Sequence, residues 1–354
     1  MTLPAPRTGE LPGGGADLPP SDYLDFVTKE YLASYVSRGG AAVKLLVVGT
    51  EAAARELADG LATLDDGFVH VGVDAASTKI HMIDQLFFAV TRQVDWLGLA
   101  AAAVRAAYSR VGFPVAPGAG DTGLTVTEVA AYHELDATEL YRSVRRSLEN
   151  AVLHDLTLSH EFRTAMLRLC QAQLGRGDVS DPERAAVLGW LQGEKVPAAE
   201  LRRVSLHSKV ARHSARPLLV SLTRWLRRAG RAGLVLQLDL ERLAVARRPP
   251  AGLRDGIYYS RAAAMDAYEV LRQLIDSTDE LEGLFAAVLL PPELVTDESR
   301  GLPAYTALQL RVADEVRDRH RPNPYAALVR IGRQRSEPSD GRPSEGPSRM
   351  EAVR

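Results

Sequence analysis

Three consecutive segments near the start of the chain constrain its fold more than any other feature. Residues 43–48 form a continuous apolar run that stops at Gly49. Residues 50–64 then carry apolar side chains at helical spacing, and residues 68–73 form a second apolar run. Short apolar runs of this kind are typical of strands buried on both faces of a parallel sheet. A strand, a helix and a strand within about 30 residues predict an α/β sheet with right-handed crossovers.

Further apolar runs extend this pattern toward the C-terminus. They lie at residues 233–238, 284–290 and 325–331, so we expect an α/β fold with a mostly parallel sheet of five strands. Residues 80–230 carry mainly helical patterns and predict a large helical insertion between the second and third strands. The α/β domain is expected to span residues 21–331.

The remaining patterns predict helices and chain ends. Ser21 or Asp22 is expected to cap a helix that ends at Arg38, and Ser214 is expected to cap another. The other predicted helices cover residues 80–111, 124–153, 159–174, 182–192, 260–275 and 304–320. Residues 1–20 and 332–354 are rich in Pro, Gly, Ser or Arg, and we expect a disordered lead and a disordered tail.

Composition excludes several classes of protein. The formal net charge is −2, which gives no overall argument for nucleic-acid binding. The single cysteine, Cys170, rules out an intramolecular disulfide and a cysteine-based zinc site. The longest apolar run, residues 96–104, is far shorter than the ~20 residues of a membrane-spanning helix. Without a signal-peptide pattern, the expected location is cytoplasmic, with no membrane partner.

The carboxyl end of the first strand is the first candidate site, because ligands bind there in open parallel sheets. A phosphate-binding loop at this place reads G-x-x-x-x-G-K-[ST], with backbone N–H groups and a lysine on the phosphates. Aligned on Gly49 and Thr50, the second glycine is Ala54, the lysine is Arg55 and the hydroxyl residue is Glu56. Only the first glycine of this motif is kept.

The end of the third strand is the second candidate site. Asp239 stands where a P-loop protein holds the aspartate for Mg²⁺, which a glutamate that activates water usually follows. Here the next residue is Leu240, and Glu241 lies one position further on. Because a shift of one residue turns a side chain to the other face of an extended segment, Glu241 is a weak replacement.

Lysine scarcity bears directly on the phosphate loop. Only five of the 43 basic residues are lysines, and none follows a glycine in a phosphate-loop position. A carboxylate from Glu56 beside the phosphates would cost on the order of 4 kcal/mol at 4 Å and an effective dielectric of ~20. That corresponds to about a thousandfold in affinity, unless Arg55 offsets it or pairs with Glu56 and fills the site.

Several further segments, together with these two positions, carry a resemblance to a known family. The chain resembles the P-loop ATP-binding proteins of BREX phage-defence systems over roughly residues 40–331. The segments that carry the resemblance are 190–194, 208–216, 218–226, 233–239, 259–276, 301–305 with Arg311, and 323–331.

The resemblance implies an AAA+-like P-loop ATPase fold of the ASCE class, in which the aspartate-bearing strand lies beside the P-loop strand. It makes Gly49 the start of the phosphate loop, Asp239 the Mg²⁺ residue and Arg311 a trans-acting or sensor arginine. It implies ATP with Mg²⁺ as cofactor. It also implies other defence subunits as partners (a methyltransferase, a helicase or a related ATPase), indirect association with DNA, and allows an oligomer.

Four positions depart from the P-loop pattern: Ala54, Arg55, Glu56 and Leu240. They favour a degenerate pseudo-ATPase, which in the extreme case binds no nucleotide at all. Such a protein would serve as a structural or regulatory subunit and not as an enzyme. Two alternatives stay open. One is an active ATPase that uses Arg55 for the phosphates, with Glu241 and Arg311 as weak catalytic candidates. The other is a DNA-binding or adaptor module that uses an arginine stripe near residues 224–231.

Overall fold

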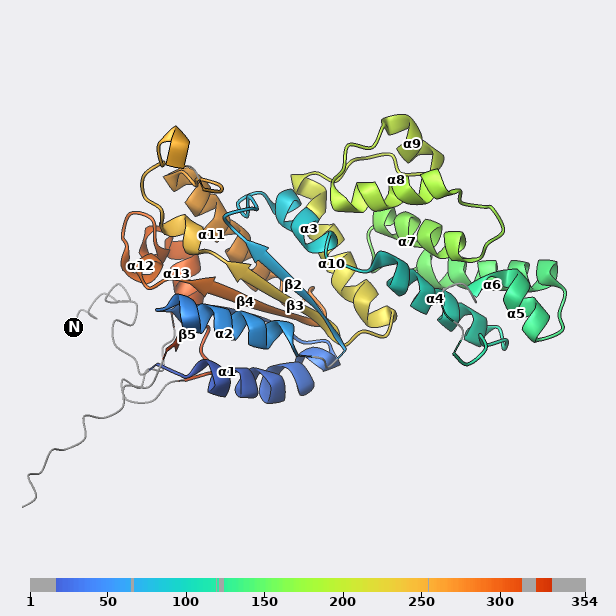
Figure 1. Cartoon of the computed structure of the whole chain (residues 1–354), viewed down its shortest axis with the longest axis horizontal. Helices are drawn as coiled ribbons and strands as arrows, with labels where there is room; N and C mark the ends of the chain where they lie inside the picture. The colour runs from blue at the N-terminus through green and yellow to red at the C-terminus, as the bar shows by residue number, and fades with distance from the viewer. Residues whose placement is uncertain are drawn as a thin grey trace, which may run out of the picture.

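A five-stranded, entirely parallel sheet forms the centre of the molecule (Figure 1). The computed structural model describes residues 17–64, 67–118, 120, 124–253, 255–313 and 323–332. The strands are β1 (Ala41–Val48), β2 (Phe68–Asp74), β3 (Gly233–Asp239), β4 (Leu284–Leu290) and β5 (Leu328–Ile331). Each of the five predicted strands is therefore present, and the predicted α/β, P-loop NTPase-like fold class is confirmed.

The strand order is β2-β3-β4-β1-β5, and it corrects one expectation. The aspartate-bearing strand β3 does not lie beside β1, because β4 pairs with both: Leu284 is opposite Ala41 on one side and Leu234 on the other. Every residue of β4 is buried, as expected for a central strand. The carboxyl ends of β1, β4 and β3 therefore form one continuous edge.

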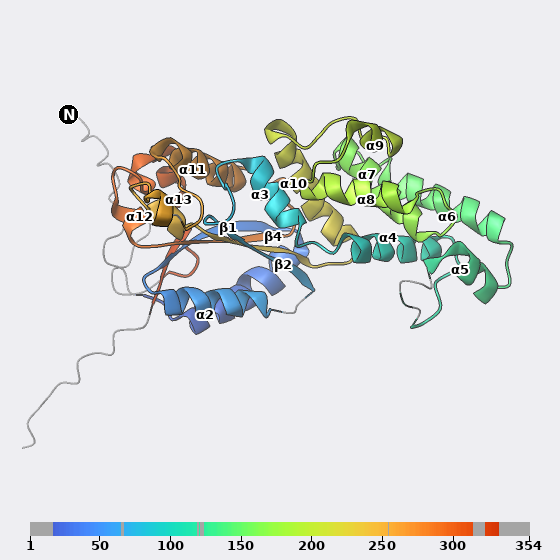
Figure 2. The ribbon, with the colours of Figure 1, turned by 45° about the horizontal axis from the view of Figure 1, so that its top comes forward.

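Alternate residues of the strands belong to two separate cores, one on each face of the sheet. Leu45 and Val47 of β1 join the larger core, whereas Leu46 and Val48 join the smaller one. The smaller core is completed by α1 (Pro20–Phe26), η1 (Val27–Ala33), η2 (Val36–Arg38) and α2 (Glu51–Ala62). Figure 2 shows α2 beneath the sheet and α11, α3 and α10 above it. This layering confirms that β1 is buried on both faces, whereas the edge strand β2 leaves Gly72 and Asp74 exposed.

The first helix differs from its prediction. The predicted single helix over 21–38 is divided into α1, a π-helical turn and a 3-10 turn. Its N-cap is Pro19, and neither Ser21 nor Asp22 caps it. Pro20 occupies the first helical position, where the fixed φ of proline suits the helix and its missing N–H costs nothing.

The helical insertion between β2 and β3 contains more, shorter helices than predicted. They are α3 (Ile83–Thr91), α4 (Trp96–Arg110), α5 (Val126–Tyr132), α6 (Ala137–Val152), α7 (His160–Gln173), α8 (Asp181–Gln192), α9 (Ala198–Arg203) and α10 (Arg212–Arg228). Asp95 and Asp136 break the two long predicted helices, because each side chain caps a new helix. Ser214 lies inside α10, and its hydroxyl accepts the N–H of Ala211. Helices α4 to α9 form a lobe beside the sheet (Figures 1 and 2).

The C-terminal part completes the sheet domain. Its elements are η4 (Glu241–Ala244), η5 (Ala251–Leu253), α11 (Arg261–Asp276), α12 (Glu293–Thr296), η6 (Leu302–Ala304) and α13 (Thr306–Val312). Of the helix predicted over 304–320, the described part is α13, and residues 314–322 lie outside the described residues. No helix among the described residues is long and apolar enough to cross a membrane.

Most of the predicted lead and tail, residues 1–16 and 333–354, lies outside the described residues. At the inner end of the lead, Leu18 pairs with the edge strand β5. Its N–H donates to the carbonyl of Arg330 at 3.0 Å, and its own carbonyl accepts the N–H of Gly332 at 3.0 Å.

Candidate functional site

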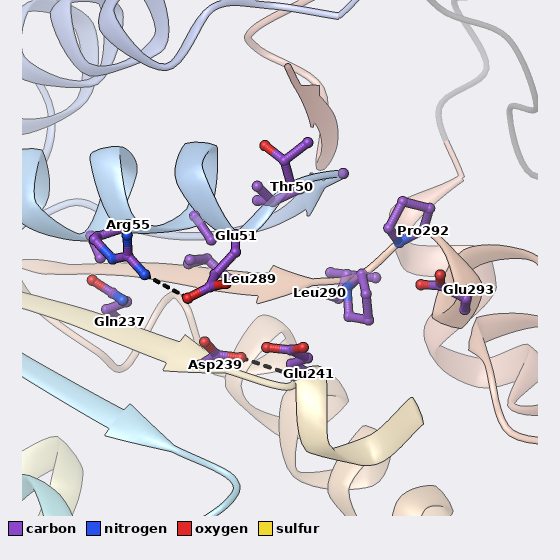
Figure 3. Close-up of a pocket in the computed structure, with 15 residues that line it drawn as sticks. Thr50, Glu51, Arg55, Gln237, Asp239, Glu241, Leu289, Leu290, Pro292 and Glu293 are labelled. Atoms are coloured by element: carbon purple, nitrogen blue, oxygen red, sulfur yellow. Dashed lines mark hydrogen bonds and ion pairs between the residues drawn. The ribbon is translucent and has the colours of Figure 1, made fainter. Parts of the chain in front are cut away.

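A cavity of about 470 Å³ opens at the carboxyl ends of β1, β4 and β3. The residues that line it come from three chain segments that meet at this edge (Figure 3). They are Val48, Gly49, Thr50, Glu51, Ala54, Arg55, Ala58, Gln237, Asp239, Glu241, Leu289, Leu290, Pro291, Pro292 and Glu293. The fold thus brings both sequence-predicted positions, Gly49 and Asp239, into one cavity.

The connection from β1 to α2 is too short for a phosphate loop. Strand β1 ends at Val48 and α2 begins at Glu51, so only Gly49 and Thr50 lie between them. Thr50 caps the helix: its hydroxyl oxygen accepts the N–H of Ala53 at 3.2 Å, and its carbonyl accepts the N–H of Ala54 at 3.0 Å. Ala54 and the two residues after it therefore lie in a helix, where a phosphate loop would present free N–H groups.

Gly49 also differs from the glycines of a phosphate loop. A Cβ at Gly49 would meet no atom within 4 Å, and the residue does not have the positive φ that favours glycine. In a phosphate loop, glycines allow sharp turns and a close approach of the backbone to the ligand. Neither need is present at Gly49.

Arg55 pairs with Glu51 and not with Glu56, which corrects the expected pairing. Its Nη2 lies 2.5 Å from Oε1 of Glu51, one helical turn earlier. The two side chains are 66% and 84% exposed, so the pair contributes about 0–1 kcal/mol. Glu56 is exposed on α2 and does not line the cavity. The carboxylate that faces the ligand space from α2 is therefore Glu51.

Asp239 is the last residue of β3 and is held by the turn that follows it. Its Oδ1 accepts the N–H of Glu241 at 2.9 Å (Figure 3). Burial raises the pKa of Asp239, and nearby Asp74 raises it further, although the N–H of Glu241 opposes the shift. Leu240 is buried at 1% exposure, while Glu241 lines the cavity beside Asp239. Glu241 is thus placed near the ligand space, and its catalytic role stays a prediction.

The charge of the cavity is unfavourable for a triphosphate. Four carboxylates line it, and Arg55 is the only cation among the lining residues. The carboxylates are those of Glu51, Asp239, Glu241 and Glu293. Among the described residues, no group of three or more His, Cys, Asp or Glu side chains is arranged to hold a metal ion. The carboxylates therefore repel phosphate oxygens without forming a ready Mg²⁺ site.

Arg311 is not brought to this cavity. It lies on α13, where its Nη2 donates to Oδ2 of Asp276 at 2.9 Å and its Nη1 donates to the carbonyl of Ala307 at 2.7 Å. This partnership is the largest cause of the lowered pKa of Asp276. Any sensor or trans-acting role for Arg311 stays a prediction.

The arginine stripe of α10 is largely engaged within the molecule. Arg224 lies 3.2 Å from Glu282, and Arg228 pairs with Asp155. Arg227 donates to the carbonyls of Ser37 at 2.8 Å and Ala232 at 3.2 Å. These contacts tie the helical insertion to the sheet domain, so they do not favour the DNA-binding alternative.

Sequence reasoning missed Glu51, Gln237 and Glu293 as cavity residues. Glu51 was not predicted to line the cavity because the motif alignment treats residues 50–53 as a loop. Glu293 was not predicted because β4 lies between β1 and β3 only through the strand order of the sheet, which the apolar runs do not show. The Pro291-Pro292 pair was a usable signal, since it ends a strand at the same edge.

A stability measurement tests the raised pKa of Asp239. Since its pKa is raised in the folded state, its ionised form opposes folding, and this cost is present above the folded pKa. Asp239→Asn keeps an oxygen for the N–H of Glu241 but carries no charge. We expect the variant to have a larger free energy of unfolding than the wild type at pH 7. The difference should vanish below about pH 3.9, where aspartate is protonated in both states. Urea titrations at several pH values measure this, and a less stable variant at pH 7 would contradict it.

Comparison with known proteins gives a match to one family model, which covers the C-terminal part of the chain. A family model described as BREX system ATP-binding protein BrxC/D matches residues 124–336, which is more than half of the chain. The matched span contains Asp239 but not Gly49. Neither the curated proteins nor the solved structures contain a match to the chain.

Proposed function

Because the chain belongs to the family of BREX system ATP-binding proteins BrxC/D, we propose that it is a degenerate member of that family. It keeps the P-loop NTPase-like sheet but hydrolyses ATP slowly or not at all. It acts as a structural or regulatory subunit of a phage-defence assembly.

The observation that carries this proposal is the two-residue connection Gly49-Thr50 between β1 and α2. A triphosphate is normally held by several N–H groups of a longer loop together with a lysine. Here the first turn of α2 is capped by Thr50, and the first cation is Arg55, paired with Glu51. In place of a phosphate-binding loop, the chain has a helix start that is capped by Thr50.

The electrostatics of the cavity support the same conclusion. Glu51 is 84% exposed, so water screens its repulsion of a phosphate oxygen, which is about 1 kcal/mol at 4 Å. Asp239 and Glu241 add to the repulsion from the opposite wall. The weak, exposed Glu51–Arg55 pair leaves Arg55 able to turn toward a ligand, so a variant at Arg55 belongs in the test.

What the fold retains supports a role as a subunit. The sheet, both cores and the helical insertion are present, whereas the connection from β1 to α2 lacks the length of a phosphate loop. Family membership implies partners within a BREX system, and we propose that they include a methyltransferase, a helicase or a related ATPase. Association with DNA would then be indirect, through those subunits.

Measurement of ATP turnover tests the proposal. With radiolabelled ATP and Mg²⁺, we expect the purified protein to release phosphate at the background rate. Asp239→Ala and Arg55→Ala should leave that rate unchanged, because neither residue acts in turnover. Hydrolysis that is lost in Asp239→Ala would contradict the proposal. Hydrolysis that also falls in Arg55→Ala would show an active ATPase with a non-standard phosphate site.

A further inference from the structure

A second cavity, of about 540 Å³, has the opposite charge from the first. Three cationic side chains line it, Lys79, Arg242 and Arg248, and no carboxylate does. The other lining residues are His81, Pro249, Gly256, Ile257, Tyr258, Ser260 and Ala263. They come from the connection after β2, the turn η4 after β3 and the segment that leads into α11. The cavity therefore combines segments that are far apart in the sequence.

Arg242 is fixed in the wall of this cavity with one donor unused. Its Nε donates to the carbonyl of Ile257 at 2.7 Å, which sets the plane of the guanidinium. Its Nη2 is buried and has no hydrogen-bond partner among the described residues. Buried donors normally have partners, and a guanidinium presents its N–H groups in a geometry that matches phosphate oxygens. The unpartnered Nη2 points to an anionic acceptor that binds from outside the chain.

The start of α11 adds to the positive potential. Ser260 caps this helix by accepting the N–H of Ala263 at 3.2 Å, and both residues line the cavity. The helix runs for 16 residues, and the N-terminal end of a helix carries a partial positive charge. Anions are stabilised at such ends.

Three carboxylates near the cavity are engaged elsewhere. Asp74 is engaged in the turn after β2, where its Oδ1 accepts the N–H of Ala76 at 2.6 Å. Burial lowers the pKa of His81, and the charges of Asp266 and Asp84 partly oppose this shift. None of the three lines the cavity. The lining is thus net positive, although the whole chain has a formal net charge of −2.

Apolar and aromatic residues also line the cavity. Pro249, Ile257 and Tyr258 are among them, and the Tyr258 hydroxyl donates to the carbonyl of Ala246 at 3.3 Å. An aromatic ring beside cations suits a base that stacks next to its phosphate. The volume is within the usual range for small-ligand sites.

We propose that this cavity binds the phosphate group of a nucleotide unit, with Arg242, Arg248 and Lys79 on the phosphate and Tyr258 beside the base. The nucleotide is either free or part of a nucleic-acid strand. This site is distinct from the degenerate ATP cavity and does not depend on the proposed loss of ATP turnover.

Fluorescence anisotropy with two probes tests the proposal on the full chain. One probe is a labelled 20-nucleotide single-stranded DNA, and the other is a labelled AMP. The variant Lys79→Glu/Arg248→Glu changes two exposed side chains, and Arg242 is left in place because its Nε supports the backbone at Ile257. The matched control, Lys195→Glu/Arg202→Glu, changes two exposed cations outside the cavity by the same total charge.

We expect the wild type and the control to bind at least one probe, and the cavity variant to bind it at least tenfold more weakly. For the DNA probe, the slope of log affinity against log salt should fall by about one per lost phosphate contact. Tight DNA binding that AMP does not displace identifies a strand as the source, whereas direct AMP binding identifies a free nucleotide. Absence of binding to both probes by the wild type, or equal binding by the cavity variant and the control, would overturn the proposal. Asp239→Ala should leave this binding unchanged, which separates the result from the ATP test.

Discussion

Replacement of Arg300 by methionine is expected to lower the free energy of unfolding by about 3 kcal/mol or more. Arg300 is only 5% exposed. Its Nη2 donates to the carbonyl of Tyr259 at 2.7 Å and its Nε to the carbonyl of Leu243 at 3.2 Å. Hydrogen bonds from a charged group contribute about 1.5–3 kcal/mol each, and their loss leaves buried carbonyls without partners. Methionine fills similar space without any donor.

This arginine matters for function because of what it connects. Leu243 lies in η4, the turn that follows Asp239 and carries both Glu241 and Arg242. Tyr259 directly precedes the cap of α11. Arg300 therefore joins η4, which contributes Glu241 to the first cavity and Arg242 to the second, to the segment before α11.

Urea denaturation followed by circular dichroism measures the effect. Arg202→Met is the matched control, because Arg202 is exposed on α9 and surface changes usually remain within about ±0.5 kcal/mol. If Arg300→Met is as stable as Arg202→Met, the assigned role of Arg300 is wrong.

The sheet was predictable because its strands are short, continuous apolar runs. The run at 284–290 matches β4 residue for residue, since every side chain there is buried. The order of the strands was not predictable in the same way. It depends on which buried edges pair in three dimensions, and the resemblance placed β3 beside β1 where β4 actually lies.

Helix boundaries show where local chemistry overrides apolar spacing. The spacing alone joined α3 to α4 and α5 to α6. The aspartates that separate them, Asp95 and Asp136, are strong caps whose side chains bond to N–H groups of the following helix. Attention to capping residues within the long patterns would have found both breaks.

The candidate site was predictable in place but not in detail. Gly49 and Asp239 do meet at one edge, as strand ends in a parallel sheet must. The motif alignment failed between Thr50 and Glu56, because it assumed a loop where Thr50 starts a helix. The positive cavity was missed altogether, since Lys79 is far from Arg242 and Arg248 in the sequence and the three follow no motif.

The largest functional effect expected is the loss of ATP affinity at the first cavity. Four carboxylates line this cavity and repel a triphosphate, although water screens the exposed Glu51. The missing loop N–H groups and the missing lysine act in the same direction. The central claim is therefore that this cavity does not hold MgATP at micromolar concentrations.

Titration with a fluorescent ATP analogue and Mg²⁺ tests this claim most directly. The titration is made on the Lys79→Glu/Arg248→Glu variant, so that the positive cavity does not contribute to the signal. We expect no saturable binding in the micromolar range, with or without Mg²⁺, and the same trace after Asp239→Ala is added. Saturable, Mg²⁺-dependent micromolar binding that disappears with Asp239→Ala would contradict it.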